Sequence, residues 1–227
     1  MTFTEIINNL FTGFGLTILL FALTLVLAIP LGLLISLGAM SKIKPIKWLM
    51  KGIIWVIRGT PLMLQIVVVS FIPSKLFSIQ NKAIAAFFGT TMANVNFMFC
   101  VIAFVINYAC YFAEIFRGGI EGIPKGQYEA CAVLGMTKSQ TFFKVVLPQV
   151  IKRIIPPMGN EIITLVKDTS LARAIGVVEI IKAAQDAVNV TVTIWPLFYS
   201  GLFYLIFNGL LTVLFRFVEK KLDYYHA

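Results

Sequence analysis

The stretch from Ile6 to Ser41 contains no aspartate, glutamate, lysine or arginine. It is longer than the ~20 apolar residues that a helix needs to cross a bilayer, and longer than the apolar region of a cleavable signal. It therefore predicts a first membrane helix over about residues 13–37, with a kink at Pro30. Residues 1–10 are expected to form a short amphipathic entry helix.

Composition places the whole chain in the membrane class. Hydrophobic residues make up 59% and charged residues 13% of the 227 positions, whereas soluble domains carry about 25% charged residues. The net charge of +9 does not indicate nucleic-acid binding, because the basic residues cluster at the edges of apolar spans, as the positive-inside rule predicts. The cysteines lack metal-ligand spacing and the single histidine, His226, stands in the terminal tail, so no metal site is expected.

The charge pattern predicts an all-α membrane protein that forms one transmembrane domain over residues 1–227. The expected spans are about 13–37, 46–72, 97–116, 149–166 and 195–218. Lysines between residues 42 and 51 mark the cytoplasmic side, so the N-terminus is expected outside and the C-terminus inside. The fourth span is the least apolar, but without it the basic residues 216–221 would lie opposite those lysines.

Two of the connecting regions are expected to be external. Residues 73–96 are predicted to be a loop with a short helix near 83–88, and residues 167–193 a polar region with a surface helix over 183–190. Within the second span, Arg58-Gly59-Thr60-Pro61 predicts a break or kink. Arg58 either belongs to an opened backbone there or simply reaches the cytoplasmic headgroups.

The cytoplasmic loop over residues 117–147 has its own local structure. Pro124 suits the first turn of a short helix, and Gln127 to Leu134 are good helix formers. Gly135 is a natural stop in the left-handed conformation, and Thr137 with Gln140 has the spacing of a capping box for a second helix. The spacing alone fits either an ordinary loop or a compact docking element.

This loop resembles the EAA motif of permease subunits in ATP-binding-cassette importers, of the polar-amino-acid branch. The matching residues are Glu129, Ala130, Gly135, Leu147 and Pro148, with Cys131 where alanine is usual and Val145 where isoleucine is usual. The resemblance extends from about residue 10 to the C-terminus. It includes Arg58–Pro61, Ala113–Gly119, Ile123–Gln127, Leu147–Gln149, Pro156-Pro157, Asn160 and Lys167–Ser170.

The resemblance implies that residues 129–135 form a coupling helix, which docks on a cytoplasmic ATP-binding subunit. Leu147 and Pro148 would then connect it to the fourth span. It further implies a second copy or a similar permease, an extracellular or periplasmic amino-acid-binding protein, and ATP with Mg on the partner subunit. The expected function is translocation of polar amino acids across the cell membrane by alternating access.

The substrate pathway is predicted from polar residues at membrane depth. Glu161 and its neighbour Asn160 lie within the fourth span, where ionisable groups usually face a cavity. Thr60 and Gln65 could bind an α-carboxylate, and Asp168 ends the fourth span at the outer face. Glu161 could instead be held structurally by a neighbouring helix, and Asp168 could simply reach the headgroups. A glutamate suits a cationic side chain, but equally any α-ammonium group.

No nucleotide-binding G-x-x-x-x-G-K-[ST] loop or catalytic constellation occurs in the sequence, so this chain is not expected to be an enzyme. The main alternative function is a transporter or channel driven by an ion gradient, without an ATP-binding partner. A subunit that only supports assembly is a further alternative. The basic loop and the lack of paired intramembrane acids beyond Glu161 argue against an ion-driven mechanism.

Overall fold

The computed structural model describes residues 1–222, and this part of the chain contains helices and no strands. His226 lies outside the described residues. The elements in chain order are α1 (Phe3–Ala39), α2 (Lys44–Arg58), α3 (Leu62–Leu76), α4 (Asn81–Phe87), α5 (Met92–Glu121), α6 (Lys125–Val133), α7 (Lys138–Gln140), the π-helix η1 (Thr141–Val146), α8 (Leu147–Asp168), the 3-10 helix η2 (Thr169–Ile175), α9 (Ile180–Thr191) and α10 (Trp195–Lys221).

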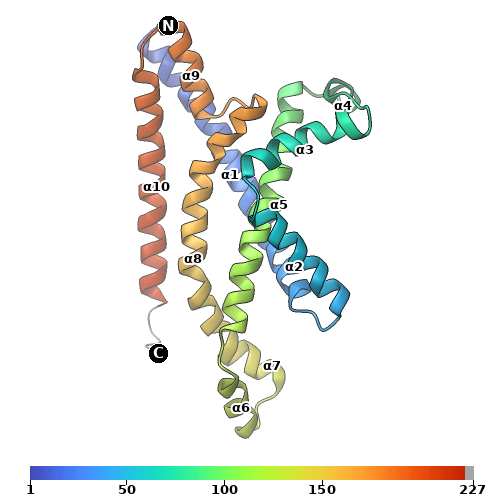
Figure 1. Cartoon of the computed structure of the whole chain (residues 1–227). Coiled ribbons are helices and arrows are strands. Elements are labelled where there is room, and N and C mark those ends of the chain that lie inside the picture. The colour runs from blue at the N-terminus through green and yellow to red at the C-terminus, as the bar shows by residue number, and fades with distance from the viewer. Residues whose placement is uncertain (223–227) are drawn as a thin grey trace.

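The long helices α1, α5, α8 and α10 form a bundle in which α8 and α10 stand side by side and α1 crosses α5 obliquely (Figure 1). Helices α2 and α3 project to one side as a bent arm. The N-terminus and α9 lie at one end of this bundle, and α6 and α7 form a knob at the opposite end. The main hydrophobic core lies where α1, α5 and α8 meet. This arrangement separates the knob from the far end by the full length of the bundle.

Small residues on α1 allow it to pack closely against α5. A Cβ atom added to Gly32 would lie 2.8 Å from the Ala109 carbonyl oxygen and 2.9 Å from Cβ of Phe112, so only glycine fits there. Small side chains at helix interfaces are the usual solution in membranes, where dispersion contacts hold helices together. The buried small or hydroxyl residues along α1 are Gly13, Thr17, Thr24, Ala28, Gly32, Ser36 and Ala39.

Membrane-spanning character is clear for three helices among the described residues. By length and composition α1, α5 and α10 could cross a bilayer, and the pair α2 and α3 gives a fourth span if it is counted as one broken helix. The expected fourth span does form a helix, α8. Its proline pair and charged residues make it less apolar than α1, α5 and α10, so it does not count among these three helices. A count of five spans therefore remains a prediction.

Several local expectations are confirmed and others need correction. The interrupted second span is broken, with 108° between α2 and α3. Residues 1–10 do not form a separate helix, because the capping box of Thr2 and Glu5 starts α1, which then runs without interruption through Pro30. The short helix expected near 83–88 is confirmed as α4, but the rest of residues 73–96 is less loop-like than expected, since α3 continues to Leu76 and α5 starts at Met92.

The helix expected on the outer surface is only partly a surface helix. One side of α9, including Ile180 and Ala184, is buried against Ile6 and Leu10 of α1. Gly13 allows this close contact, because a Cβ there would lie 3.0 Å from Cβ of Ala183 and the two helices would have to move slightly apart. The end of the bundle that carries the N-terminus is therefore tied together by α1 and α9.

Candidate functional site

The break between α2 and α3 borders a cavity of about 630 Å³ that lies between the bent arm and the bundle. This volume falls within the ~300–1,000 Å³ range of small-molecule sites. Four parts of the chain contribute to its wall: the break itself, α5, α8 and η2. The lining residues are Arg58, Gly59, Thr60, Pro61, Leu62, Asn107, Tyr108, Tyr111, Glu161, Thr164, Asp168 and Leu171.

A hydrogen-bond network holds the break open. Pro61 has no N–H group and a helix usually ends before it, so the last carbonyls of α2 lack their normal partners. The Gln65 amide nitrogen donates to the Ile57 carbonyl at 2.8 Å, the Thr60 carbonyl at 3.1 Å and the Thr60 hydroxyl at 2.8 Å. Asn107 on α5 donates in turn to the Gln65 side-chain oxygen at 3.0 Å. The opened backbone is thus fixed to α5 and not free.

Charged groups of both signs line the cavity. The Arg58 guanidinium lies over the Tyr111 ring, 5.0 Å from its centroid, which is the geometry of a cation–π contact. Across the cavity, the Tyr108 hydroxyl donates to the Asp168 carboxylate at 2.7 Å. Glu161 is half-buried on α8, on the same helical face as Asp168 and two turns away from it. A ligand in this cavity would meet one cation and two carboxylates.

The sequence-predicted substrate residues divide into two groups. Thr60, Glu161 and Asp168 line the same cavity, although they come from distant parts of the chain. Gln65 does not line it, because its amide is engaged within the break. Asn160 is exposed on α8 and does not line the cavity either.

The lining residues that sequence reasoning missed or underused include one cation and three polar or aromatic residues of α5. Arg58 contributes to the cavity wall, and so do Asn107, Tyr108 and Tyr111 of α5. The spacing of the last three is a usable signal, because positions i, i+1 and i+4 share one helix face and are polar or amphipathic in an otherwise apolar span.

The knob at the far end of the molecule has the predicted backbone. Gly135 has φ of +69°, in the left-handed region that favours glycine. The Met136 N–H donates to the Cys131 carbonyl and the Gly135 N–H to the Ala132 carbonyl, both at 3.0 Å, which is a Schellman motif. The capping box of Thr137 and Gln140 is also present.

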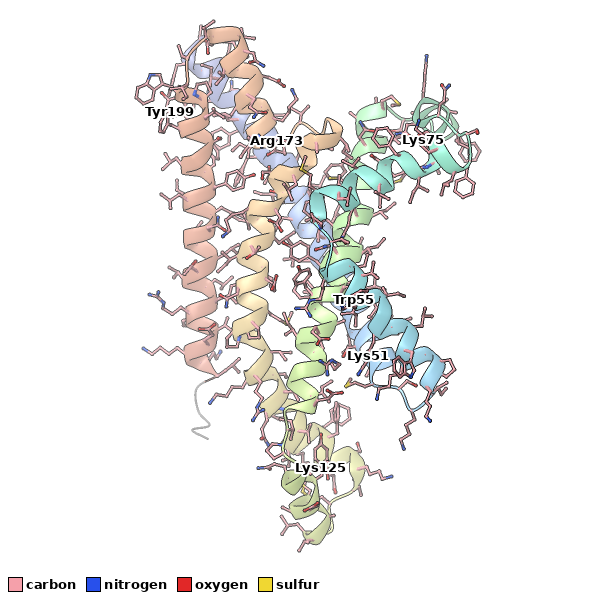
Figure 2. The ribbon with its side chains drawn as sticks, in the orientation of Figure 1. Lys51, Trp55, Lys75, Lys125, Arg173 and Tyr199 are labelled. Atoms are coloured by element: carbon pink, nitrogen blue, oxygen red, sulfur yellow. The ribbon has the colours of Figure 1, made fainter. Side chains whose placement is uncertain are left out.

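The knob presents both polar and apolar groups to its surroundings. Glu129 and Ala130 are exposed, whereas Cys131 is buried. Val133 and Leu134 are 88% and 77% exposed at the tip, which sequence reasoning did not single out. Protruding apolar side chains on a polar element are typical of a docking surface. Lys125 marks the knob in Figure 2, well away from Trp55 and the break.

The knob is connected to the cavity by a continuous helical path. After the short α7, the π-helix η1 leads directly into α8, with Leu147 and Pro148 at its first two positions. The same helix carries Glu161 and Asp168. With a rise of 1.5 Å per residue, Glu161 lies about 21 Å along α8 from Leu147.

Comparison with known proteins identifies the family. Residues 28–224 match the family described as binding-protein-dependent transport system inner membrane component. The chain belongs to this family. It is 36% identical over 217 residues to the L-cystine transport system permease protein TcyB of Bacillus subtilis, covering 95% of this chain and 87% of the relative. It is 32% identical to the arginine transport system permease protein ArtQ of the same organism, covering 92% and 90%.

Solved structures agree with this assignment. A crystal structure of an amino acid ABC transporter with histidines matches with a TM-score of 0.79 and 30% identity, over 97% of this chain and 99% of that one. The inward-facing MetNI methionine ABC transporter matches with a TM-score of 0.68 at 17% identity, over 98% and 100%, which supports the fold alone. The chain is therefore a permease component of an ATP-binding-cassette importer, and an ion-gradient-driven transporter is not favoured.

Proposed function

We propose that this chain translocates polar amino acids through the cavity at the α2–α3 break. The observation that carries the proposal is the charge set of Arg58, Glu161 and Asp168 around one cavity. Arg58 can bind an α-carboxylate, and a carboxylate of α8 can bind the α-ammonium group. The two carboxylates exceed the single cation by one charge, so a cationic side chain completes the balance. We therefore expect arginine, lysine or histidine to be preferred.

The proposed topology is a single transmembrane domain with five spans. In it α8 crosses the membrane, the N-terminus is outside and the C-terminus cytoplasmic, and the knob is the cytoplasmic coupling loop between spans three and four. The charge distribution supports it, because only this count places all basic clusters on one side. The cytoplasmic membrane is the proposed location.

The proposed assembly is a dimer, with a second copy or a similar permease, on two ATP-binding subunits. These subunits would hold ATP and Mg, and an external amino-acid-binding protein would deliver substrate. The docking element comprises Glu129, Ala130, Cys131 and Gly135, of which Cys131 is buried and supports the three exposed residues. Leu147 and Pro148 lie at the joint to α8. Closure of the ATP-binding subunits would move the knob, and α8 would transmit that movement to the cavity and alternate its access.

The test is ATPase activity of the reconstituted importer in liposomes, measured against a panel of amino acids delivered by the binding protein. Cationic amino acids should stimulate it most. Glu161→Gln should weaken the apparent affinity for the stimulating cationic amino acid by about ten- to a hundredfold, because a charged hydrogen bond contributes roughly 1.5–3 kcal/mol. Glu219→Gln, an exposed carboxylate on α10, is the matched control and should be neutral. Stimulation by neutral amino acids alone, unaffected by Glu161→Gln, would refute the substrate assignment.

A further inference from the structure

A second cavity adjoins the first on the side of the knob. It has a volume of about 580 Å³ and lies between α2 and the second half of α5. Its lining residues are Lys51, Ile54, Trp55, Arg58, Gly59, Tyr111, Glu114 and Arg117. Lys51 and Trp55 mark it in Figure 2, below the break and toward the end that carries the knob. We call it the inner vestibule.

Three residues belong to the walls of both cavities: Arg58, Gly59 and Tyr111. They are therefore the partition between the substrate cavity and the inner vestibule. Gly59 contributes only backbone, so the partition consists of the Arg58 side chain and the Tyr111 ring, in contact at 5.0 Å from guanidinium to ring centroid. The direct way from the substrate cavity to the vestibule runs past this pair.

The charges on the two sides of the partition act on Arg58 in opposite directions. Glu161 on the substrate side interacts electrostatically with it, and so does Glu114 on the vestibule side. Glu114 is already held by two hydrogen bonds from Arg117, so its pull on Arg58 is partly compensated. The guanidinium thus has a carboxylate on either side and an aromatic face between them.

The backbone beneath Arg58 is fixed, whereas its side chain is not. Gln65 ties the carbonyls of Ile57 and Thr60, on either side of the Arg58-Gly59 pair, to the wall of α5. Movement of Arg58 is therefore a rotation of its own long side chain and needs no change of the break. This is the arrangement expected of a small gate on a rigid frame.

We propose that the Arg58–Tyr111 pair is the inner gate of the translocation path. The gate is closed when the guanidinium lies on the ring, and it opens when Arg58 leaves the ring toward Glu114. The inference rests on the proposed function for its biological meaning. A substrate ammonium group on Glu161 would compensate the carboxylate that attracts Arg58 to the substrate side, so that occupancy of the cavity favours opening toward Glu114.

The test measures access to the substrate cavity directly, without transport. The three cysteines of this chain are first replaced by alanine. In the assembled importer, Thr164→Cys then reports on the substrate cavity and Trp55→Cys reports on the vestibule. Each lines only its own cavity, and both positions are exposed. A membrane-impermeant trimethylammonium methanethiosulfonate is applied to inside-out vesicles without nucleotide or substrate, and the labelling rates are compared.

With the gate intact, Thr164→Cys should react slowly. Tyr111→Leu should raise its rate about two- to fivefold, since a cation–π contact of an exposed cation is of that order, and Arg58→Gln should do the same. Tyr111→Phe keeps the ring and should leave the rate within about twofold. Trp55→Cys should react at one rate in all backgrounds. Assembly with the ATP-binding subunit provides the check on folding.

Two results would overturn the gate. One is a Thr164→Cys rate that neither Tyr111→Leu nor Arg58→Gln changes. The other is an equal increase with Tyr111→Phe, because the hydroxyl and not the ring would then be responsible. The labelling needs no substrate, so its outcome is independent of the amino-acid panel. A gate could be present in an importer that carries another solute, and an amino-acid importer could lack it.

Discussion

Replacing Gly135 by alanine should damage coupling through the backbone alone. Gly135 has φ of +69°, and an L-residue in the left-handed region costs about 1–2 kcal/mol. A Cβ atom at this position would meet nothing within 4 Å, so no steric clash adds to that cost. The population of the native knob geometry, relative to a frayed one, should therefore fall by a factor of roughly 5–30.

Two further variants isolate the cause. Gly126 lies inside α6, and a Cβ there also meets nothing within 4 Å, but its backbone is helical. Gly126→Ala should therefore stabilise α6 by about 0.5–1 kcal/mol, the opposite sign. Gly135→Asn should recover part of the loss, because asparagine tolerates the left-handed conformation better than alanine.

The assay has a structural and a functional part. Hydrogen exchange should accelerate at the amides of Gly135 and Met136, which donate the two Schellman bonds, in Gly135→Ala but not in Gly126→Ala. Substrate transported per ATP hydrolysed should fall in the same variant, with normal amounts of protein in the membrane. Equal defects in Gly135→Ala and Gly135→Asn, or unchanged exchange and transport in both, would refute the reasoning.

The remaining predictions concern three other positions. Gln65→Ala removes the side chain that donates three hydrogen bonds at the end of α2. The free energy of unfolding of the purified complex should therefore fall by about 1–3 kcal/mol, at roughly 1 kcal/mol per bond. An unchanged free energy of unfolding would mean that water replaces the Gln65 side chain fully. Glu179 is the fully buried residue that caps the start of α9. Burial raises the pKa of its carboxyl, against the opposing hydrogen bonds from the Ile181 and Lys182 N–H groups. Its stabilising contribution is thus complete below the ordinary value of 4.5 and is lost as pH rises through the folded pKa. Glu179→Gln should therefore flatten the decline of melting temperature between mildly acidic and neutral pH, and an unchanged slope would contradict this. Glu129→Arg should weaken co-purification with the ATP-binding subunit without reducing membrane insertion, and normal ATP-driven uptake would exclude Glu129 from docking.

Sequence patterns were sufficient where the cause is local. The break at Arg58–Pro61, the left-handed Gly135 and the capping box of Thr137 all follow from properties of single residues or short spacings, and each is present. The continuity of α1 was not foreseen, because its first residues look amphipathic in isolation while the adjoining apolar run extends the helix through them. The packed side of α9 depends on Gly13, a contact with a distant segment that no local pattern reveals.

The candidate site shows the same division. Glu161 could be selected from its membrane depth, and Thr60 and Asp168 meet it in one cavity. Gln65 was predicted to bind substrate because it is polar, but its side chain instead binds the broken backbone. Its bonds to the Ile57 and Thr60 carbonyls form only where the helix is broken. Arg58 was underused because a single arginine near a span end has an ordinary explanation at the headgroups. Only the three-dimensional meeting of α2, α5 and α8 shows that it lines a cavity.

The position of α8 imposes a thermodynamic symmetry on the proposed importer. One continuous helix begins at the joint to the knob, at Leu147, and carries Glu161 and Asp168 in the cavity wall. If nucleotide binding shifts this helix and thereby changes substrate affinity by some factor, linkage requires that substrate change nucleotide affinity by the same factor. Coupling through this helix is therefore reciprocal and cannot act in one direction alone. Equilibrium titrations under conditions that prevent hydrolysis, performed in both orders, should therefore return a single coupling free energy for the two ligands.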